Sequence, residues 1–446
     1  MKVLKFGGTS VGTVESLRHV KAIVESQQSR CIVIVSALGG ITDRLIRTAN
    51  LAASRDHAYT TEFEIVTARH HEVIEGVVPA ESRAEVLAIT DAMLDELATL
   101  YKAICLLGEL TPRTLDMIVS YGERMSCVIV SRILGVPVLD SRSFIRTQSR
   151  FGKHVLDAET TSSLLREAFG PLEQANTVVV PGFIASDSNA QVTNLGRGGS
   201  DYTAAIIAAE LGAEILEIWT DVDGFMTADP RIVADARVID RLSFVEAMEL
   251  CNFGAKVVYP PTIYPVFHRN IPIVIKNTFN ASAPGTMIAE RVNQTEMTVK
   301  GVTSLADTAL IRVVGRTFHD FGRVVNSMAR NGVDMFLASP TAGTFGVRQN
   351  DSVKAVSVLR EELAAELTSG DVDAIEAVDS LATLAIVGRN LRSMPESAEM
   401  LRRALNQEGI PVLTAPRNDS DTTVACMVPA SHVKQALNAV HSSFFS

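Results

Sequence analysis

The sequence predicts an α/β protein, in which a mostly parallel sheet with helices on both faces precedes two ferredoxin-like units. Strand patterns alternate with helical patterns from residue 1 to about residue 290, and this alternation favours a parallel sheet. Hydrophobic residues make up 47% of the chain and aromatic residues only 5%. Such aliphatic chains suit parallel strands that are buried between helices. After Pro284-Gly285 the pattern changes and an internal repeat begins.

The strands of the first part are predicted from short, nearly uninterrupted aliphatic runs. They are residues 3–4, 31–38, 177–185, 215–222 and 271–277. Helical patterns start at Val14 and Thr42, and residues 60–107 form a long, mostly helical region with few breakers. The 446 residues exceed the usual size of one hydrophobic core. We therefore expect a first domain over residues 1–290 and smaller domains after it.

The internal repeat predicts the two smaller domains. Residues 309–316 match 381–389, and residues 325–333 match 401–410, in the same order. Each copy reads as a strand, a helix, two strands and a helix, which is typical of a ferredoxin-like unit. A chance likeness between two unrelated α/β segments is the alternative, but the matching order and spacing favour duplication. The expected units are 299–370 and 378–446, and the two can exchange a strand.

Composition limits the classes of function. The formal net charge is −10 and no basic run occurs, so nucleic acid binding, which needs a positive surface, is not expected. The five cysteines show no metal-binding spacing, which indicates a reducing compartment. No apolar run approaches 18 residues and the N-terminus lacks a signal pattern, so we expect a cytoplasmic protein that does not enter a membrane. The nine histidines show no ligand spacing, and His70-His71 is expected on a helix surface.

The segment KFGGTSVG at residues 5–12 is the strongest candidate for ligand binding. It follows a short strand and opens a helical pattern. Gly7 and Gly8 lack the side chains that would keep a phosphate away from backbone N–H groups, and the next helix offers its positive N-terminus. Lys5 adds a mobile positive charge. The segment matches neither the Walker pattern nor GxGxxG, and a tight turn without a ligand is the simpler alternative.

Two further segments lie where ligands often bind. Residues 195–203 are again glycine-rich and contain Arg197, which suits bidentate recognition of a carboxylate or phosphate. Ser200 and Asp201 in that segment could instead be caps of the following helix. Residues 219–224 (WTDVDG) end a strand, and ligands bind at the carboxyl ends of strands in open α/β sheets. A β-turn is the simpler interpretation there, and the sequence beyond it lacks the calcium-binding pattern.

Two more segments carry weaker signals. Residues 120–124 place Gly122 within a helical pattern. A glycine there costs about 1 kcal/mol relative to alanine, so it is expected to allow a close approach or to start a helix. Lys256 follows a glycine in residues 253–256, and an isolated lysine of this kind is more often a solvated side chain.

Together these segments resemble the aspartate kinases of the amino acid kinase family. The resemblance covers essentially the whole chain, and the repeat resembles the paired ACT domains that bind regulatory amino acids. The matching strings are 5–12, 35–42, 121–126, 195–204, 219–224, 229–231, 253–257 and 275–278, in the order of the family. Some relatives carry a fused homoserine dehydrogenase, of which these 446 residues contain nothing, so a monofunctional enzyme is expected.

The resemblance implies that ATP, with Mg²⁺, phosphorylates the β-carboxylate of L-aspartate to 4-phospho-L-aspartate, the first step toward lysine, threonine and methionine. The physical interpretation agrees. A carboxylate with a pKa near 4 is already ionised at neutral pH, so no general base is needed. The enzyme has to bring two anions together and stabilise the charge on the transferring phosphoryl group, which lysines, glycine-loop amides and Mg²⁺ can do.

The resemblance also implies roles for individual residues. Lys5 and Asp201 are expected to be catalytic, Arg197 to hold the α-carboxylate of the substrate, and Glu123 to hold its ammonium together with Asp201. The expected substrate-binding residues are Ser36, Thr42, Glu123, Phe183, Arg197, Gly198 and Ser200. The expected ATP-binding residues are Lys5, Gly7, Gly8, Ser10, Thr220, Asp221, Met226, Arg231 and Lys256. No protein ligand to a metal is expected. Many relatives have a tyrosine in place of Met226.

Alternatives from other classes stay open at this point. Kinases of the same family act on glutamate, N-acetylglutamate or UMP, although they do not usually combine this glycine motif with two ACT-like units. A non-enzymatic amino acid sensor with a degenerate kinase domain is disfavoured by the retention of Lys5, Glu123, Arg197 and Asp201. The expected partners are L-aspartate, ATP, a lysine or threonine effector at the ACT-like units, and further copies of the chain in a homodimer or homotetramer.

Overall fold

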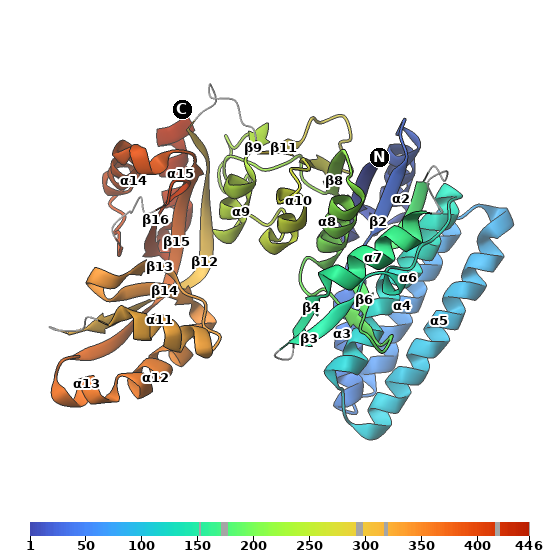
Figure 1. The fold of residues 1–446 in the computed structure, drawn as a ribbon, viewed down its shortest axis with the longest axis horizontal. Coiled ribbons are helices and arrows are strands. Elements are labelled where there is room, and N and C mark those ends of the chain that lie inside the picture. Colours follow the sequence, from blue (N-terminus) through green and yellow to red (C-terminus); the bar gives the residue numbers. More distant parts are fainter. Residues whose placement is uncertain (151–152, 171–176, 291–297, 316–319, 415–419, 446) are drawn as a thin grey trace. The chain divides into compact units, whose positions relative to one another are not determined.

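The computed structural model describes residues 1–150, 153–170, 177–290, 298–315, 320–414 and 420–445 (Figure 1). The chain divides into two compact units. The first comprises Met1–Phe225, Asp240–Phe244 and Val257–Val292, and the second comprises Met226–Ile239, Val245–Lys256 and Asn293–Ser446. Two short segments inside the predicted first domain thus belong to the second unit. The predicted domain boundaries themselves stay predictions.

A seven-stranded sheet forms the centre of the first unit, in the order β5-β2-β1-β8-β10-β11-β9. The five strands from β5 to β10 are parallel, β11 runs antiparallel to β10, and β9 runs parallel to β11. The strands are β1 Lys2–Phe6, β2 Cys31–Val35, β5 Thr177–Pro181, β8 Ile215–Thr220, β9 Arg241–Leu242, β10 Ile273–Asn277 and β11 Thr286–Ile288. Every residue of β2 is buried, as expected of a strand covered on both faces. The predicted parallel sheet is confirmed.

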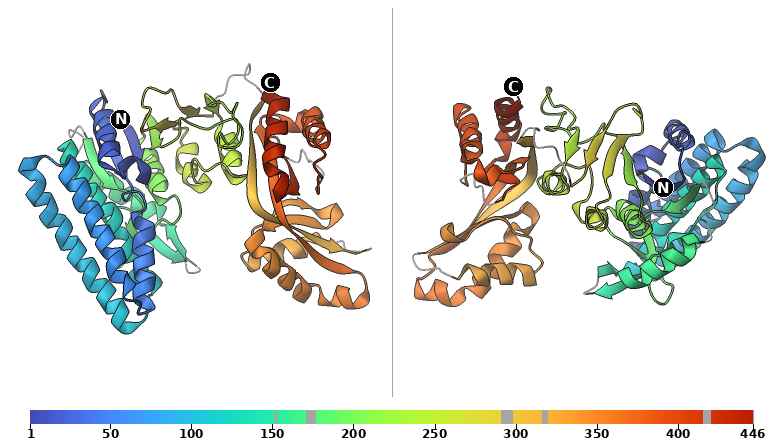
Figure 2. Two further views of the ribbon diagram at one scale, coloured as in Figure 1. Left: turned by 180° about the vertical axis from the view of Figure 1, so that it is seen from behind. Right: turned by 45° about the horizontal axis from the view of Figure 1, so that its top comes forward.

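Helices and two small hairpins surround this sheet. The helices are α1 Gly8–Val11, α2 Val14–Glu25, α3 Ile41–Ala53, α4 Ala58–Val77, α5 Ala80–Leu107, α6 Pro112–Leu134, α7 Ala158–Phe169, α8 Gly199–Leu211 and α10 Tyr264–Phe267. The hairpins pair β3 Thr147–Arg150 with β4 Lys153–Leu156, and β6 Ile184–Ser186 with β7 Val192–Asn194. Helices α4, α5 and α6 lie side by side in a helical layer (Figures 1 and 2). Helix α6 begins at Pro112 after the N-cap Thr111 and ends at Leu134, before the C-cap Gly135, whose φ is +66°.

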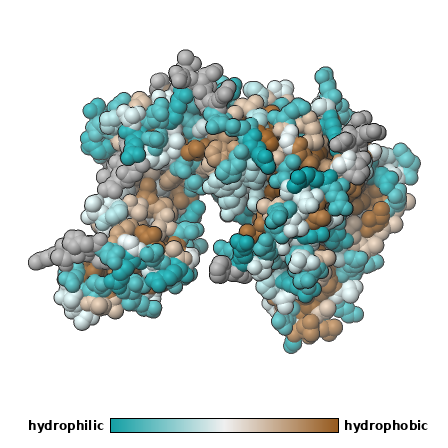
Figure 3. All heavy atoms as spheres, in the orientation of Figure 1, coloured by the Kyte–Doolittle hydropathy of each residue, from teal (hydrophilic) through white to brown (hydrophobic). Residues whose placement is uncertain are grey.

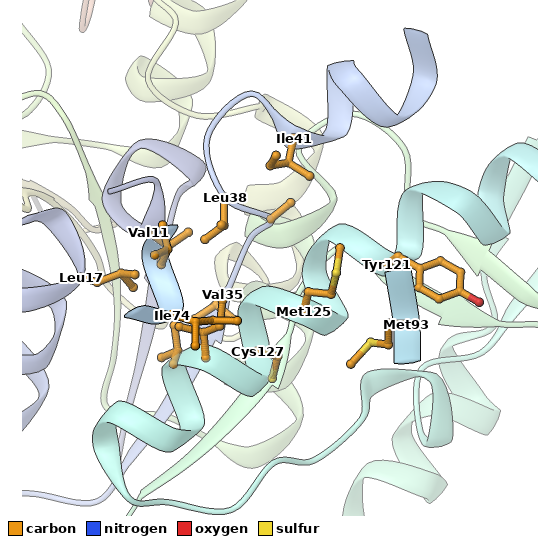
Figure 4. Close-up of a cluster of buried hydrophobic side chains, with 14 of the residues drawn as sticks. Val11, Leu17, Val35, Leu38, Ile41, Ile74, Met93, Tyr121, Met125 and Cys127 are labelled. Carbon is orange, nitrogen blue, oxygen red and sulfur yellow. The ribbon is translucent and has the colours of Figure 1, made fainter. Parts of the chain in front are cut away.

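The core of the first unit joins the helical layer to the sheet. Figure 4 shows Val35 and Leu38, at the end of β2 and just after it, in one buried cluster with Met125 and Cys127 of α6. The prediction of a surface position is wrong for His70, which is fully buried in α4. Its Nδ1 contacts the Val66 carbonyl at 2.8 Å, and burial lowers its pKa to about 4, because a buried imidazolium loses its hydration.

A five-stranded antiparallel sheet forms the second unit, in the order β13-β14-β12-β15-β16. The strands are β12 Val299–Val314, β13 Phe336–Ser339, β14 Thr344–Arg348, β15 Ala374–Gly388 and β16 Thr423–Pro429. The helices are α9 Phe244–Asn252, of which all but the first residue belong here, α11 Phe321–Arg330, α12 Ser352–Glu362, α13 Ala364–Ser369, α14 Pro395–Gln407 and α15 Val433–Phe445. The long strands β12 and β15 pair from Val299–Gly388 to Val314–Ala374, so both repeats share one sheet (Figure 2).

The first repeat has the predicted order of strand, helix, two strands and helix. The second repeat differs, because the described residues after α14 contain one strand, β16, where two were predicted. Leu413 still donates its N–H to the Met427 carbonyl at 2.9 Å, so this segment touches β16 without forming a regular strand. Arg316, the last residue of the repeat segment 309–316, lies outside the described residues.

The surface facing the viewer in Figure 3 mixes hydrophilic residues with scattered hydrophobic ones. One exposed hydrophobic spot lies at the end of α5, where Leu106 and Leu107 are each 73% exposed. Among the described residues, no helix is both long enough and apolar enough to cross a bilayer.

Candidate active site

Two glycine-containing loops meet at the carboxyl ends of the neighbouring strands β1 and β2. A Cβ atom on Gly39 would lie 3.0 Å from the carbonyl oxygen of Gly8, and one on Gly12 would lie 3.3 Å from the Gly39 nitrogen. Gly7 donates its N–H to the Trp219 carbonyl of β8 at 3.1 Å, which fixes the first loop to the sheet. The absence of side chains therefore allows two backbones to approach at the place where ligands bind in α/β sheets.

A third loop, residues 195–198, leads into α8. Gly196 and Gly198 have φ values of +72° and +70°, the left-handed conformation that glycine adopts without steric cost. A Cβ atom on Gly199 would lie 2.7 Å from the ring of Phe183, so this position also requires glycine. Arg197 stands between the two left-handed residues. The loop geometry thus accounts for the glycines that helix capping alone did not explain.

The three loops and α6 surround a cavity of about 370 Å³. The structure brings together all residues predicted as catalytic or substrate-binding, since Lys5, Ser36, Thr42, Glu123, Phe183, Arg197, Gly198, Ser200 and Asp201 all line this cavity. Gly8 lines it as well. The sequence reasoning missed Asp43, in the first turn of α3, and the glycines at 39 and 40, although the Gly39-Gly40 pair was a visible signal. The binding roles of these residues stay predictions.

Lys5 and Asp201 form an ion pair at the end of β1. The Lys5 Nζ lies 2.6 Å from the Asp201 Oδ1, and the two side chains are 11% and 12% exposed. This short distance marks a direct charge contact, although the angles are not those of a hydrogen bond. A Cβ atom on Gly7 would lie 3.4 Å from the same Nζ, so the ammonium stands against the glycine loop. A positive charge against a glycine loop that opens a helix is suited to a phosphate group.

Glu123 places a buried carboxyl group at the cavity, and backbone N–H groups of Ala37 and of Glu123 itself contact this carboxyl. Its side chain is only 4% exposed, and its Oε2 has no hydrogen-bond partner among the described residues. Burial raises the pKa of this carboxyl to about 8, because the charged form loses its hydration. A buried acceptor without a partner is costly unless a ligand donates to it. The position is therefore suited to a cationic group of a ligand.

Gly122 explains how Glu123 reaches the cavity. A Cβ atom on Gly122 would lie 2.8 Å from the Cβ of Ala37, so α6 packs directly on the segment after β2. This confirms the expectation of a close approach, and Gly122 lies in the middle of α6 rather than at its start. The adjacent Glu123 then faces the loop that begins at Ser36.

Arg197 is the free cation of the cavity. Its side chain is exposed, and it forms no ion pair with any residue that the structure describes. Together with Glu123 it provides one anion-binding and one cation-binding group in the same cavity. This combination is suited to a molecule with both a carboxylate and an ammonium group.

The remaining residues predicted to bind ATP lie outside this cavity. Ser10 is fully buried, and its Oγ contacts the Thr278 Oγ1 at 2.7 Å and donates to the Trp219 carbonyl at 3.2 Å. Its hydroxyl thus joins α1 to β8 and to the end of β10. Thr220 and Asp221 stand at the carboxyl end of β8, where the Thr220 hydroxyl donates to the Asp221 carboxylate at 3.2 Å.

Three other predicted ATP-binding residues belong to the second unit: Met226, Arg231 and Lys256. Met226 is half-buried and Lys256 is exposed. Arg231 forms a bidentate pair with Asp229, at 2.9 Å and 2.7 Å, and is 82% exposed. The pair holds the pKa of the Asp229 carboxyl below its usual value.

Comparison with known proteins identifies the family. The model described as the amino acid kinase family matches residues 1–277, which include every residue of the cavity. The chain belongs to the amino acid kinase family. A model of the ACT domain matches residues 384–444 of this amino acid kinase, within the second repeat. The predicted fold class, an amino acid kinase fold followed by ferredoxin-like ACT units, is thereby confirmed.

Several curated proteins that are similar to this amino acid kinase are aspartokinases. The bifunctional aspartokinase/homoserine dehydrogenase of Haemophilus influenzae is 30% identical over 464 residues, which cover 100% of this chain and 57% of that protein. A chloroplastic bifunctional relative from Zea mays is 33% identical, over 99% of this chain and 50% of that protein. The chain thus spans about half the length of these relatives. Aspartokinase 2 from Arabidopsis thaliana is 28% identical over 99% of this chain and 84% of that protein.

Solved structures show the same likeness over the whole chain. The structure of E. coli aspartokinase III in complex with aspartate and ADP, in the R-state, superposes with a TM-score of 0.85 at 27% identity and covers 100% of both chains. The T-state of the same enzyme, in complex with lysine and aspartate, gives a TM-score of 0.78 at 26% identity.

Proposed function

We propose that this amino acid kinase is an aspartate kinase, which transfers the γ-phosphoryl group of ATP to the β-carboxylate of L-aspartate. The observation that carries the proposal is the cavity in which the free Arg197, the buried Glu123 carboxyl with its unsatisfied Oε2, and the Lys5 ammonium meet. The likeness to aspartokinase III, whose structure contains aspartate and ADP, supports the same substrates.

The α-amino acid group of the substrate is assigned to two side chains of opposite charge. Arg197 would bind the α-carboxylate through its planar guanidinium, which matches the geometry of a carboxylate. Glu123 would accept hydrogen bonds from the ammonium, with Asp201 beside it, and so fill the buried acceptor that is free in the structure. Ser36, Thr42, Phe183, Gly198 and Ser200 would shape the rest of the pocket around the short side chain.

The transferring phosphoryl group is assigned to Lys5 and the loop with Gly7 and Gly8. One oxygen of the β-carboxylate attacks the γ-phosphorus, the bond from that phosphorus to the β–γ bridging oxygen breaks, and ADP leaves. No proton has to be removed from the nucleophile, because the β-carboxylate is already ionised. The Lys5 ammonium and the loop amides would stabilise the negative charge of the transition state.

ATP would enter as its Mg²⁺ complex, in which the metal neutralises phosphate charge and comes with the substrate. Thr220 and Asp221, at the end of β8, are proposed to contact the nucleotide. The same role is proposed for Ser10, Met226, Arg231 and Lys256. Methionine in place of the tyrosine of many relatives would make the adenosine contact less aromatic at residue 226.

Formation of an acyl phosphate tests the proposal directly. The protein is incubated with L-aspartate, ATP and Mg²⁺, and the product is trapped as a hydroxamate with hydroxylamine. We expect a hydroxamate signal that requires L-aspartate, ATP and Mg²⁺ together. Parallel hydroxamate reactions with L-glutamate and N-acetyl-L-glutamate test two rival kinases. UMP is tested by the release of ADP, because its phosphorylated product contains no acyl phosphate and gives no hydroxamate. N-acetylglutamate is a poor match because it lacks the ammonium that Glu123 would bind. ATP binding without turnover of any acceptor would favour an amino acid sensor instead.

We further propose that lysine or threonine binds to the ACT units as an effector. A second cavity, of about 510 Å³, lies within the second unit and contains Arg312, Glu249 and Ser339. Arg312 forms no ion pair with a described residue, and the Ser339 Oγ is buried without a hydrogen-bond partner among them. Glu249 already accepts a hydrogen bond from the Thr423 hydroxyl at 2.7 Å. These groups could bind the carboxylate and the ammonium of a small amino acid.

Calorimetric titration of the full chain with lysine or threonine, alongside Arg312→Ala, tests this effector site. Binding that the variant loses supports it. Equal binding by both proteins would place the effector elsewhere, and no binding at all would contradict the effector proposal.

We propose a cytoplasmic homodimer or homotetramer. None of the five cysteines forms a disulfide among the residues that the structure describes, which is consistent with a reducing compartment. On the ACT units, Val353 of α12 is 82% exposed and Val325 of α11 is 44% exposed, and both could be covered by another copy. Light scattering after size exclusion at micromolar concentration should give at least twice the chain mass, and a monomer mass would contradict the assembly.

A further inference from the structure

We propose that Asp116 and Asn194 are positioning residues that hold the Arg197 loop in place for substrate binding. This inference rests on the proposed function. Asp116 lies on α6 and Asn194 ends β7, and neither side chain lines the cavity. The Asn194 Nδ2 donates to the Asp116 Oδ1 at 2.5 Å, across 78 residues of sequence.

The same asparagine binds the loop itself. The Asn194 Oδ1 accepts the backbone N–H of Gly196 at 2.8 Å. Gly196 precedes Arg197, and its carbonyl accepts the N–H of Gly199 at 3.0 Å, which closes the turn around the arginine. The asparagine side chain therefore connects α6 to the backbone that carries the free guanidinium.

Asp116 is fixed at both of its carboxylate oxygens. Its Oδ2 contacts the Nε2 of His154 in β4 at 2.7 Å, and its side chain is only 13% exposed. Since Gly196 needs an acceptor, the Asn194 amide oxygen must face the loop, and its NH₂ must then face an acceptor on α6. A carboxylate at position 116 meets this requirement, and the bond from His154 keeps it from rotating away.

Helix α6 relates this contact to the cavity. Asp116 and Glu123 are seven residues apart, which is two helical turns, so they share one face of α6. One rigid helix thus places the carboxyl proposed to bind the ammonium and also holds the loop of the arginine proposed to bind the carboxylate. Arg197 has no ion pair of its own among the described residues. The position of its guanidinium therefore depends on the loop backbone that carries it.

Exchange of the two side chains tests the proposal. In Asn194→Asp, two carboxylates would face each other, and the loop should be released. In the double variant D116N/N194D, the amide at 116 can donate to the carboxylate at 194, accept from His154, and leave Gly196 its acceptor. Asn194→Ala removes both bonds without adding charge. Asn50→Asp, an exposed position on α3, is the matched control.

We expect N194D and N194A to raise the KM for L-aspartate about tenfold, the size of one lost hydrogen bond, with kcat and the KM for ATP changed less than about twofold. The double variant should return the KM to within about threefold of wild type. Amide hydrogen exchange of the ligand-free protein should become faster around residues 195–198 in both single variants and slow again in the double variant. N50D should change neither measurement.

Unchanged exchange and an unchanged aspartate KM in the single variants would overturn the proposal. A double variant no better than N194D would overturn it too, because a merely structural loss is not restored by the reciprocal exchange. The exchange measurement needs no turnover. If the wild-type protein lacked aspartate kinase activity, the proposed function would fail while the exchange data still reported on the loop contact.

Discussion

Gly122 touches Ala37 so closely that a Cβ atom on the glycine would lie 2.8 Å from the Cβ of the alanine. This contact sets α6 against the segment that follows β2, and it places the next residue, Glu123, in the cavity. The close packing of one helix against one loop therefore determines where the buried carboxyl stands. A methyl group added at this contact should therefore displace the Glu123 carboxyl.

The first prediction is that Gly122→Ala destabilises the first unit, although alanine favours a helix. The added methyl group meets the Ala37 side chain within a packed core, and such overpacking typically costs about 1–3 kcal/mol. The displacement should also raise the KM for aspartate. Urea unfolding and steady-state kinetics measure the two effects.

Gly170 provides the control for this substitution. It follows α7 with helical φ and ψ angles, and apart from its chain neighbours no atom of a described residue lies within 4 Å of the place where its Cβ would stand. Gly170→Ala should therefore be neutral, or stabilising by about 0.4–1 kcal/mol through the unfolded state. A G122A protein as stable as G170A would show that α6 moves without cost and would contradict the argument.

The second prediction concerns the protonation of Glu123. Burial raises its pKa to about 8, so at pH 7 the empty site largely holds the neutral carboxyl. An ammonium group bound beside it favours the charged form. Aspartate binding should therefore release close to one proton at pH 7, and the affinity should rise as the pH is raised from 6 toward 8. Titration calorimetry in two buffers of different ionisation enthalpy measures the released proton.

Glu123→Gln should abolish this proton release and flatten the pH dependence of binding. The same variant should change stability. The folded carboxyl keeps its proton up to about pH 8, whereas the unfolded one loses it near 4.5, so this group contributes less stability as the pH rises from 4.5 to 8. Glutamine should remove that slope. Proton release of equal size in the variant would show that another group titrates.

The third prediction is that the two lysines of β1 differ in their contribution to turnover. Lys5→Met removes the ammonium next to the glycine loop and should lower kcat by about 100-fold or more, the usual effect of losing one transition-state charge contact. The KM for aspartate should change much less. Lys2→Met is the matched control, because Lys2 also pairs with a carboxylate, that of Glu217 at 3.2 Å, but at the other end of the same strand. A K5M variant that retains turnover within a few-fold of K2M would refute the role of Lys5.

Much of this architecture could be predicted because its signals are local. Uninterrupted aliphatic runs such as residues 31–35 predict buried parallel strands, and glycines beside an arginine predict a binding loop. The residues that line the cavity come from five local segments, around residues 5–8, 36–43, 123, 183 and 196–201. Their convergence follows in part from the parallel sheet, which brings the carboxyl ends of β1, β2 and β5 to one edge.

Contacts between distant residues could not be predicted from the same signals. Ser10 lies within the glycine motif, and no local pattern indicates that its hydroxyl pairs with Thr278, 268 residues away. The Asp116–Asn194 contact spans 78 residues and has no local pattern. The burial of His70 also has no local signal, because a single amphipathic stripe predicts only one buried face of a helix. Helix α4 packs against α2, α3, α5 and α6, so polar positions are also enclosed.

The last prediction follows from the burial of His70. Its Nδ1 contacts the Val66 carbonyl, whereas its Nε2 has no hydrogen-bond partner among the described residues. The folded pKa is about 4 against 6.5 when unfolded, so only the unfolded chain binds a proton between these values. The stability from the neutral histidine is present above pH 6.5 and is lost as the pH falls toward 4, by up to about 3 kcal/mol.

His70→Leu should therefore flatten the loss of stability of the first unit between pH 6.5 and 4, as measured by urea unfolding at several pH values. His57→Leu is the control, because His57 is exposed where α4 begins and its substitution leaves the buried imidazole in place. The acid sensitivity of H57L should equal that of the wild-type protein. If H70L lost stability on acidification as steeply as H57L, other groups would drive the acid unfolding, and the buried histidine would contribute nothing to it.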